Sequence, residues 1–229
     1  RRLVVVGYSI KAWLGGGMGQ YPDLDTGLAL VRTDGSLDPG GFGNGGRLAL
    51  DLPAAGRSDY AVATVALEDG RIIVAGTSDS NSGTRFFMVR MTTQGNLDPS
   101  FGERDGFAWA GSITQPSGFH RTASGQFVAC GTWLPSSAPE GRIARFDSAG
   151  DLVGETSLAS AGIEYLNACA PGKDGSVVFG GYGQAGTWLG RVGVDGRLDS
   201  AVCRRTISTS GCRTHALESC QSRRVEDRG

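Results

Sequence analysis

Leu30-Val31-Arg32-Thr33-Asp34-Gly35-Ser36-Leu37-Asp38 is the stretch that predicts the fold. An apolar run ends in a polar turn centred on glycine, and the chain then returns to Leu-Asp. The same turn recurs as Gln94-Gly95-Asn96-Leu97-Asp98, Ala149-Gly150-Asp151-Leu152 and Asp195-Gly196-Arg197-Leu198-Asp199. Its leucines lie 60, 55 and 46 residues apart. Recurrence at such intervals indicates a repeat protein built from similar supersecondary units.

A second landmark accompanies the turn, an apolar run that ends in glycine. It occurs as Val4-Val5-Val6-Gly7, Ile73-Val74-Ala75-Gly76, Val128-Ala129-Cys130-Gly131 and Val177-Val178-Phe179-Gly180. With 38 glycines beside such runs, the chain favours many short strands joined by tight turns. Two independent landmarks in four places are not expected by chance.

Each unit is predicted to contain four strands. In the clearest unit they span 28–33, 47–52, 60–67 and 71–77, and Glu68-Asp69-Gly70 joins the last two as a hairpin. The predicted fold class is therefore all-β, with repeated four-stranded antiparallel blades that form a β-propeller or partial propeller. A β-solenoid is the rival, although its coils are usually shorter, and a sandwich would not explain the recurring landmarks.

The chain divides into a repeat domain and a tail. Residues 1–201 form the predicted propeller-like domain, with units at about 27–78, 85–133 and 141–182 and a partial unit at 187–201. Residues 202–229 contain three of the five cysteines and no repeat landmark. We expect this tail to be irregular, either disordered or non-native; a basic, disulfide-bearing tail is the alternative.

Composition excludes several classes of partner. The 22 basic and 23 acidic residues leave no electrostatic footprint for nucleic acid, and no apolar run is long enough to span a membrane. No signal peptide is visible, but the chain enters a strand immediately after Arg1, which suggests a fragment. The alternative is a small closed ring in which 3–7 completes the blade that begins at Trp188.

The residues also resemble a known family. Leu30 to Asp38, Phe42-Gly43-Asn44-Gly45-Gly46, Asp69 to Gly76 and Phe87 to Gly102 are similar to the bacterial delta-60 repeat. The match is strong over 27–111 and weakens in the third unit, where the Phe-Gly step after Leu152 is missing. The resemblance implies an exported or surface bacterial protein, extracytoplasmic or secreted, and often part of a longer chain. It supplies no catalytic residues.

Motifs that could carry chemistry are weak. Gly181-Tyr182-Gly183-Gln184-Ala185-Gly186 matches a dinucleotide fingerprint, but a predicted strand follows it where a helix is needed. His120 lies in a predicted strand and is interpreted as structural. Cys130 and Cys169 are interpreted as small buried apolar residues. No catalytic residue, metal site or cofactor is predicted.

Four residues remain as binding candidates. Trp13 and Trp133 lie near loops, where an indole face suits a sugar or a cation, whereas Trp109 and Trp188 are expected in the core. Asp23 and Asp25 could ligate calcium, but solvated turn residues are the favoured interpretation. The final list of candidates is Trp13, Trp133, Asp23 and Asp25.

The predicted function is that of a non-catalytic repeat scaffold or binding module, with a carbohydrate or protein as its partner. The alternative is a propeller-type hydrolase or lyase that acts on polysaccharide through acidic loop residues. Paired carboxylates at a shared site would distinguish the two.

Overall fold

The structure is a computed structural model, and the fold it describes is all-β. The described residues are 2–14, 21–50, 52, 58–80, 83–102, 105–109, 112–135, 137–199 and 203–205. Within them every regular element is a strand except one 3-10 turn, η2 (Ala159–Ala161). The prediction of an all-β chain is confirmed.

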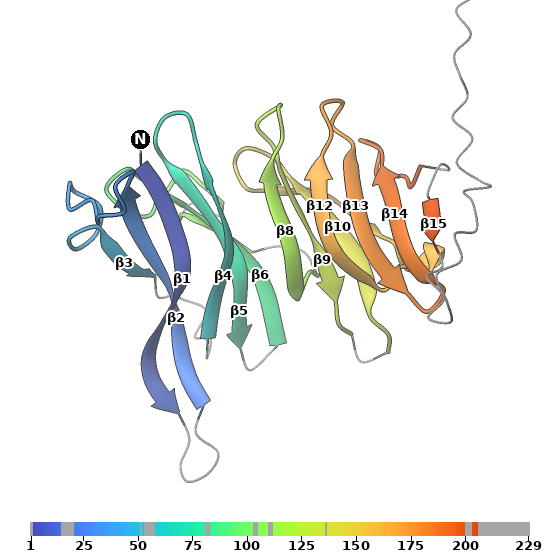
Figure 1. The fold of residues 1–229 in the computed structure, drawn as a ribbon, viewed down its shortest axis with the longest axis horizontal. Coiled ribbons are helices and arrows are strands. Elements are labelled where there is room, and N and C mark those ends of the chain that lie inside the picture. The colour runs from blue at the N-terminus through green and yellow to red at the C-terminus, as the bar shows by residue number, and fades with distance from the viewer. Residues whose placement is uncertain are drawn as a thin grey trace, which may run out of the picture.

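The strands fall into four consecutive groups (Figure 1). The first group is β1 (Arg2–Leu14), β2 (Tyr21–Arg32) and β3 (Arg47–Leu50), and the second is β4 (Ser58–Ala66), β5 (Ile72–Ser80), β6 (Gly83–Met91) and β7 (Phe107–Trp109). The third is β8 (Gln115–Arg121), β9 (Phe127–Trp133), β10 (Glu140–Phe146) and β11 (Leu152–Ser157). The fourth is β12 (Tyr165–Pro171), β13 (Val177–Gly183), β14 (Gly186–Val192) and β15 (Cys203–Arg205).

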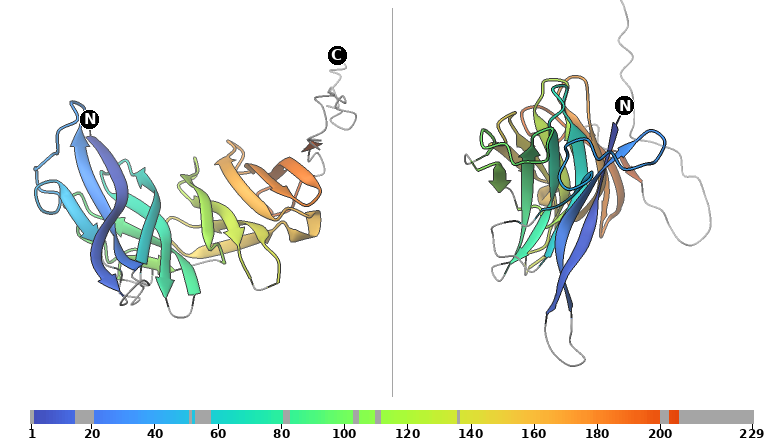
Figure 2. Two further views of the ribbon diagram at one scale, coloured as in Figure 1. Left: turned by 60° about the horizontal axis from the view of Figure 1, so that its bottom comes forward. Right: turned by 90° about the vertical axis from the view of Figure 1, so that its left-hand side faces the viewer.

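Pairing within each group is antiparallel between neighbours in the chain. The last two groups are separate four-stranded sheets with the orders β8-β9-β10-β11 and β12-β13-β14-β15. The first two groups count as one seven-stranded sheet, joined by a single parallel bridge between Leu24 and Ser58. The groups follow one another in a curved row that does not close on itself in the described residues (Figure 2).

The cores lie between neighbouring groups because alternate residues of a strand point to opposite faces. Ile73 and Ala75 of β5 belong to the core shared with the third group, whereas Ile72 and Val74 belong to the core shared with the first. In the same way β9 directs Val128 toward the fourth group and Phe127 toward the second. Sheets buried on both faces require nearly continuous apolar runs, which is what the sequence landmark consists of.

Phenylalanines dominate the core between the second and third groups. The Phe86 ring lies 6.2 Å from that of Phe119 and 5.9 Å from that of Phe146, measured between centroids. Phe119 in turn stacks on Phe127 at 5.6 Å. These pairs add to the hydrophobic stabilisation that comes from burial alone.

The Phe-Gly step of one unit meets the glycine turn of the next unit across the boundary between two groups. The Phe42 ring packs on the turn at Gly95, and the Phe101 ring packs on the turn at Gly150. Backbone bonds fix both contacts: Gly43 N donates to Gln94 O at 3.0 Å, and Gly102 N donates to Ala149 O at 2.8 Å. We call this the Phe-on-glycine contact. It joins each Phe-Gly step to the glycine turn of the next unit.

The sequence units and the sheets are offset from one another by two strands. The unit expected at 85–133 contributes β6 and β7 to the second group and β8 and β9 to the third. Each sequence unit therefore spans two groups, and the chain itself connects them. The β4–β5 hairpin forms at the predicted turn, where Gly70 N donates to Leu67 O at 3.1 Å.

Cys130 and Cys169 form a disulfide between the third and fourth groups. Both side chains are buried as expected, but they are bonded to each other, which their interpretation as small apolar residues did not predict. They lie 39 residues apart in sequence, with a Cα–Cα distance of 6.3 Å. This proximity depends on β9 and β12 meeting across the core, and sequence spacing does not reveal it.

The chain ends pair locally. β1 pairs with β2, and β14 pairs with β13 and β15, so the alternative in which 3–7 completes the last blade does not occur within the described residues. Residues 203–205 were assigned to the irregular tail, but they form β15 and extend the last sheet. The remainder of the predicted tail lies outside the described residues.

The Phe-on-glycine contact predicts different effects of one substitution at two equivalent turns. Gly35 and Gly150 both adopt a left-handed backbone, with φ of 85° and 98°. A Cβ at Gly150 would lie 2.6 Å from Phe101 Cζ, whereas a Cβ at Gly35 would have no atom within 4 Å. Gly35→Ala should cost about 1 kcal/mol of backbone strain, and Gly150→Ala about 1–3 kcal/mol more because Phe101 must move. Urea denaturation measures both, and equal losses would contradict the contact.

The disulfide predicts a redox-dependent stability. Replacing both cysteines, Cys130→Ala with Cys169→Ala, should lower the free energy of unfolding by about 2–4 kcal/mol, because the closed loop restricts the unfolded chain. Denaturation in the presence and absence of reductant measures this loss. Reductant should destabilise the native protein and leave the double variant unchanged; a native protein insensitive to reductant would contradict the bond.

Candidate functional site

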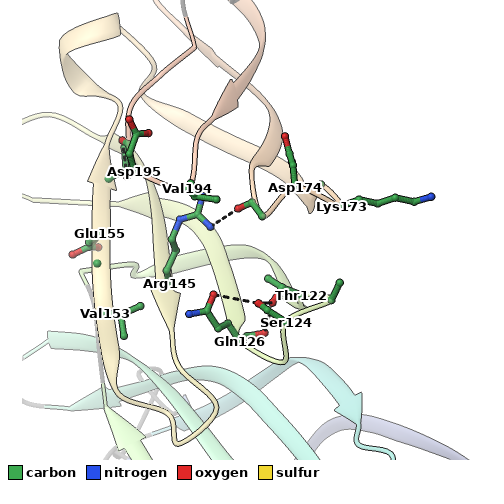
Figure 3. A pocket seen from close by; sticks show the side chains of 16 residues that line it. Thr122, Ser124, Gln126, Arg145, Val153, Glu155, Lys173, Asp174, Val194 and Asp195 are labelled. Atoms are coloured by element: carbon green, nitrogen blue, oxygen red, sulfur yellow. Dashed lines mark hydrogen bonds between the residues drawn. The ribbon is translucent and has the colours of Figure 1, made fainter.

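A pocket of about 590 Å³ lies between the third and fourth groups. The turn after β8, the start of β11 and the turns after β12 and β14 surround it, and Arg145 of β10 projects into it (Figure 3). Its size is within the range of pockets that hold small molecules.

The turns that form the pocket are held in shape by their own side chains. Asp174 Oδ1 accepts hydrogen bonds from Ser176 Oγ at 2.6 Å and from Ser176 N at 3.1 Å. These two bonds lower the pKa of Asp174 below its ordinary value. Gly125, Gly175 and Gly196 complete their turns with φ between 76° and 83°, a conformation that favours glycine. The pocket walls are therefore defined by local turn geometry.

Arg145 is the central charge of the pocket. Its Nη1 donates to Gly175 O at 2.9 Å and its Nη2 to Gly193 O at 2.9 Å. Its Nε is buried and has no hydrogen-bond partner among the described residues. Burial lowers the pKa of the guanidinium, and Asp195 partly offsets this effect. Within the part of the chain that the structure describes, no carboxylate forms an ion pair with Arg145.

The equivalent arginines of the second and the last unit do have a carboxylate, whereas the first unit has Leu30 at this position. Each arginine lies five residues before a turn glycine, and an aspartate lies three residues after that glycine. Arg90 Nε is 2.8 Å from Asp98 Oδ2, and Arg191 Nε is 3.1 Å from Asp199 Oδ2. In the third unit the aspartate position is occupied by Val153. The atom without a partner in Arg145 is thus the atom that binds aspartate in the equivalent arginines.

The third unit also lacks the phenylalanine. In the preceding unit the Phe101 ring lies 4.9 Å from Arg90 Cζ and packs on Gly150. Arg145 of the third unit is the counterpart of Arg90, and Gly196 is the counterpart of Gly150. Both line the pocket. The pocket therefore lies where the Phe-on-glycine contact is missing from the repeat.

The acidic residues of the pocket already have cationic partners. Glu155 Oε2 is 3.6 Å from Arg142 Nη1, and Asp174 Oδ2 is 3.2 Å from Arg191 Nη1. The third acid, Asp195, has Arg197 Nε at 3.9 Å from its Oδ2.

The rest of the lining is polar. Thr122, Ser124 and Thr156 contribute hydroxyl groups, and Gln126 contributes an amide. The Lys173 side chain extends away from the pocket (Figure 3). The arrangement can hold a polar ligand by hydrogen bonds around one cation.

The predicted candidates of the first group lie elsewhere. Trp13 belongs to β1, where its backbone pairs with Pro22; its side chain lies outside the described residues. Asp23 and Asp25 were interpreted as turn residues, which was wrong, because both lie within β2. Asp25 Oδ1 is 3.8 Å from Lys11 Nζ. No cluster of three or more potential metal ligands occurs among the described residues.

Trp133 is covered on one face by the protein itself. It ends β9, and the Arg142 guanidinium lies 4.3 Å from the centroid of its ring. Arg142 Nη2 is 2.8 Å from Glu140 Oε2, which holds the cation over the indole. Asp23, Asp25 and Trp133 do not line the pocket, and the Trp13 side chain lies outside the described residues. Trp109 and Trp188 pack against cores as expected.

The remaining motifs have structural roles. Gly181 to Gly186 form the end of β13, a two-residue turn and the start of β14, so a strand follows the glycines as predicted. His120 lies in β8. No helix of the described chain is both long and apolar enough to cross a membrane.

Arg145 was not predicted as a site residue. The sequence contained a signal for this site. When the turn glycines of the units are aligned, Val153 falls at the aspartate position, and the Phe-Gly step is missing from the third unit. The missing step was recognised, but only the structure shows that the empty position faces the half-buried Arg145, whose Nε has no acceptor.

Comparison with known proteins identifies the fold. A family model described as "Domain of unknown function (DUF5122) beta-propeller" matches residues 67–101. Among 14 matching chains of solved structures, "Structure of Dos1 propeller" has a TM-score of 0.51 and 12% sequence identity. That match covers 82% of this chain and 56% of the other, so this chain spans about half of its neighbour. No curated protein matches significantly in sequence. The fold is therefore propeller-like.

The Arg90–Asp98 pair predicts a pH-dependent stability. The hydrogen bond from Ser100 Oγ and the contacts of Arg71 and Arg90 hold the pKa of Asp98 well below its usual range. A lowered folded-state pKa stabilises the protein above the unfolded-state pKa, near 4, and the stabilisation is lost as pH falls toward the folded value.

Asp98→Asn should therefore cost about 3 kcal/mol at pH 7, because it leaves a buried arginine without its carboxylate. The difference from the native protein should shrink steadily below about pH 4. Denaturation at a series of pH values measures it, with the exposed Asp151→Asn as the control. A loss that does not depend on pH would contradict the ion pair.

Proposed function

We propose that this chain is a non-catalytic binding module, and that the pocket beside Arg145 is its ligand site. In this proposal the four strand groups are blades of a propeller or partial propeller, and the chain is a member of the delta-60 repeat family. The observation that carries the proposal is a pocket formed by local turns at a site where the repeat loses its own internal filling.

Preformed geometry supports binding. The pocket turns belong to hairpins of two sheets whose facing side chains form a common core, and the Cys130–Cys169 disulfide joins the same two sheets. A site carried on sheets held together in this way does not need to be ordered when the ligand arrives, which reduces the entropic cost of binding.

Hydrolysis or cleavage of polysaccharide is less well supported. Such chemistry needs a carboxyl group that is protonated near neutral pH, beside a second carboxylate. Asp174 has a lowered pKa, and the pocket acids Glu155, Asp174 and Asp195 each lie beside an arginine. The lining is thus suited to holding a ligand rather than to transferring protons.

An extracytoplasmic location is part of the proposal. The resemblance to exported repeat proteins suggests it, and the Cys130–Cys169 bond supports it because structural disulfides persist mainly in oxidising compartments. A carbohydrate or a peptide of the cell surface is then the expected class of partner.

A variant that fills the pocket tests the proposed function. Gly154 lines the pocket, a Cβ there would have no atom within 4 Å, and its φ lies outside the left-handed range. Gly154→Phe should therefore place a ring in the pocket without a backbone clash. Gly180 of β13 meets the same two conditions outside the pocket lining, so Gly180→Phe is the matched control.

Binding to an array of glycans and short peptides is the measurement. Ligands bound by the native protein should lose at least about tenfold in affinity in Gly154→Phe, because a ring occupies their volume. They should be retained by Gly180→Phe. Equal binding by both variants would place the ligand elsewhere, and release of cleaved glycan, followed by mass spectrometry, would favour the enzyme alternative.

A further inference from the structure

The surroundings of Arg90 in the preceding unit show which groups are missing around Arg145. In the equivalent position three groups of its own unit contact Arg90: Nε binds Asp98 Oδ2 at 2.8 Å, Nη2 binds Ser100 Oγ at 2.8 Å, and Cζ lies 4.9 Å from the Phe101 ring. The chain itself therefore supplies this arginine with a carboxylate, a hydroxyl and a ring. All three belong to residues 98–101; in the third unit Val153 takes the aspartate position, and the Phe-Gly step that follows is missing.

The two arginines are otherwise held alike. Arg90 Nη1 donates to Ser148 O at 3.3 Å, and Arg145 Nη2 donates to Gly193 O at 2.9 Å. Both acceptors belong to the glycine turn of the following unit. Each side chain thus reaches across to the following turn. The difference lies on the open side, where Arg90 faces Asp98 and Arg145 faces the pocket.

From this comparison we infer that the pocket binds a hydroxylated ring bearing one carboxylate, as in a uronate residue of an acidic glycan. The carboxylate takes the position of the missing aspartate at Arg145 Nε, and the ring takes the position of the missing phenylalanine. This inference rests on the proposed function and adds the chemical class of the ligand.

The charges around the pocket favour a ligand with a single negative charge. Glu155, Asp174 and Asp195 are matched by Arg142, Arg191 and Arg197, whereas Arg145 has only carbonyl oxygens as acceptors. Arg145 is half-buried, and its buried Nε has no acceptor, which is unfavourable; a ligand carboxylate relieves this cost. Charge-assisted bonds to a planar guanidinium are also the strongest that such a site can form.

The polar lining favours a sugar over an aromatic acid. Thr122, Ser124 and Thr156 place hydroxyl groups around the pocket, and Gln126 adds an amide. These groups already bond within the protein, for example Thr122 Oγ1 to Ser124 Oγ at 2.9 Å and Thr156 Oγ1 to Gly196 O at 3.1 Å. Each hydroxyl oxygen can still accept a further hydrogen bond, which a pyranose hydroxyl can donate and an aromatic ring cannot.

The test restores the missing aspartate. Val153→Asp introduces a carboxylate at the position that Asp98 occupies beside Arg90, while Val153→Asn adds the same shape without the charge. Both keep Arg145, which also ties two turns and whose removal could disturb the fold. An increase in melting temperature of Val153→Asp over Val153→Asn would report that the new carboxylate reaches Arg145.

Calorimetric titration with D-galacturonate and with D-galactose is the measurement. The native protein and Val153→Asn should bind galacturonate at least about tenfold more tightly than galactose, the ratio expected for one charge-assisted contact. In Val153→Asp this preference should disappear, because the site supplies its own carboxylate.

Several outcomes would overturn the inference. Equal affinities for the two sugars in the native protein would do so, as would no measurable binding of either, or a preference that survives in Val153→Asp. Stronger binding of benzoate would replace the sugar by an aromatic acid, and stronger binding of inorganic phosphate would reduce the site to a general anion site. If Gly154→Phe removes the binding of neutral glycans while Val153→Asp changes nothing, the proposed function stands and only the ligand class fails.

Discussion

The contact of a phenylalanine ring with a glycine turn of the next unit is the interaction on which the arrangement of this protein depends. Phe42 packs on Gly95, and Phe101 packs on Gly150. Glycine is favoured at the turn for two reasons: its backbone is left-handed, and a Cβ would press against the ring, at 3.3 Å from Phe42 in the first contact and 2.6 Å from Phe101 in the second. Because each contact links one unit to the next, the groups follow one another in a regular row.

Loss of this contact explains the site. After the Gly150 turn the chain continues directly into β11, without the loop that carries phenylalanine in the first two units. The ring and the aspartate disappear together, but Arg145 is retained. A half-buried arginine whose Nε has no acceptor, beside an unfilled volume, is costly to a fold, and such local departures from a repeat are where function is expected.

Much of the fold could be read from residue order. Strand positions follow from apolar runs that end in glycine, and hairpins follow from turns such as Asp69-Gly70, because both signals are local. The site candidates were predicted less well. Asp23 and Asp25 were interpreted as turn residues, but pairing with β1 extends β2 through them. The Cys130–Cys169 bond and the role of Arg145 depend on residues brought together from different sheets.

The sequence by itself determined the repeat, the all-β class, the turn positions and the absence of aspartate and phenylalanine from the third unit. These are properties of neighbours along the chain, where dihedral preference and side-chain alternation act directly. Only the tertiary structure decided that the third group faces the fourth, that a disulfide joins them, and that the missing side chains leave a pocket at Arg145. Those facts depend on which sheet faces pack together, and packing between distant segments is not encoded in any single stretch of residues.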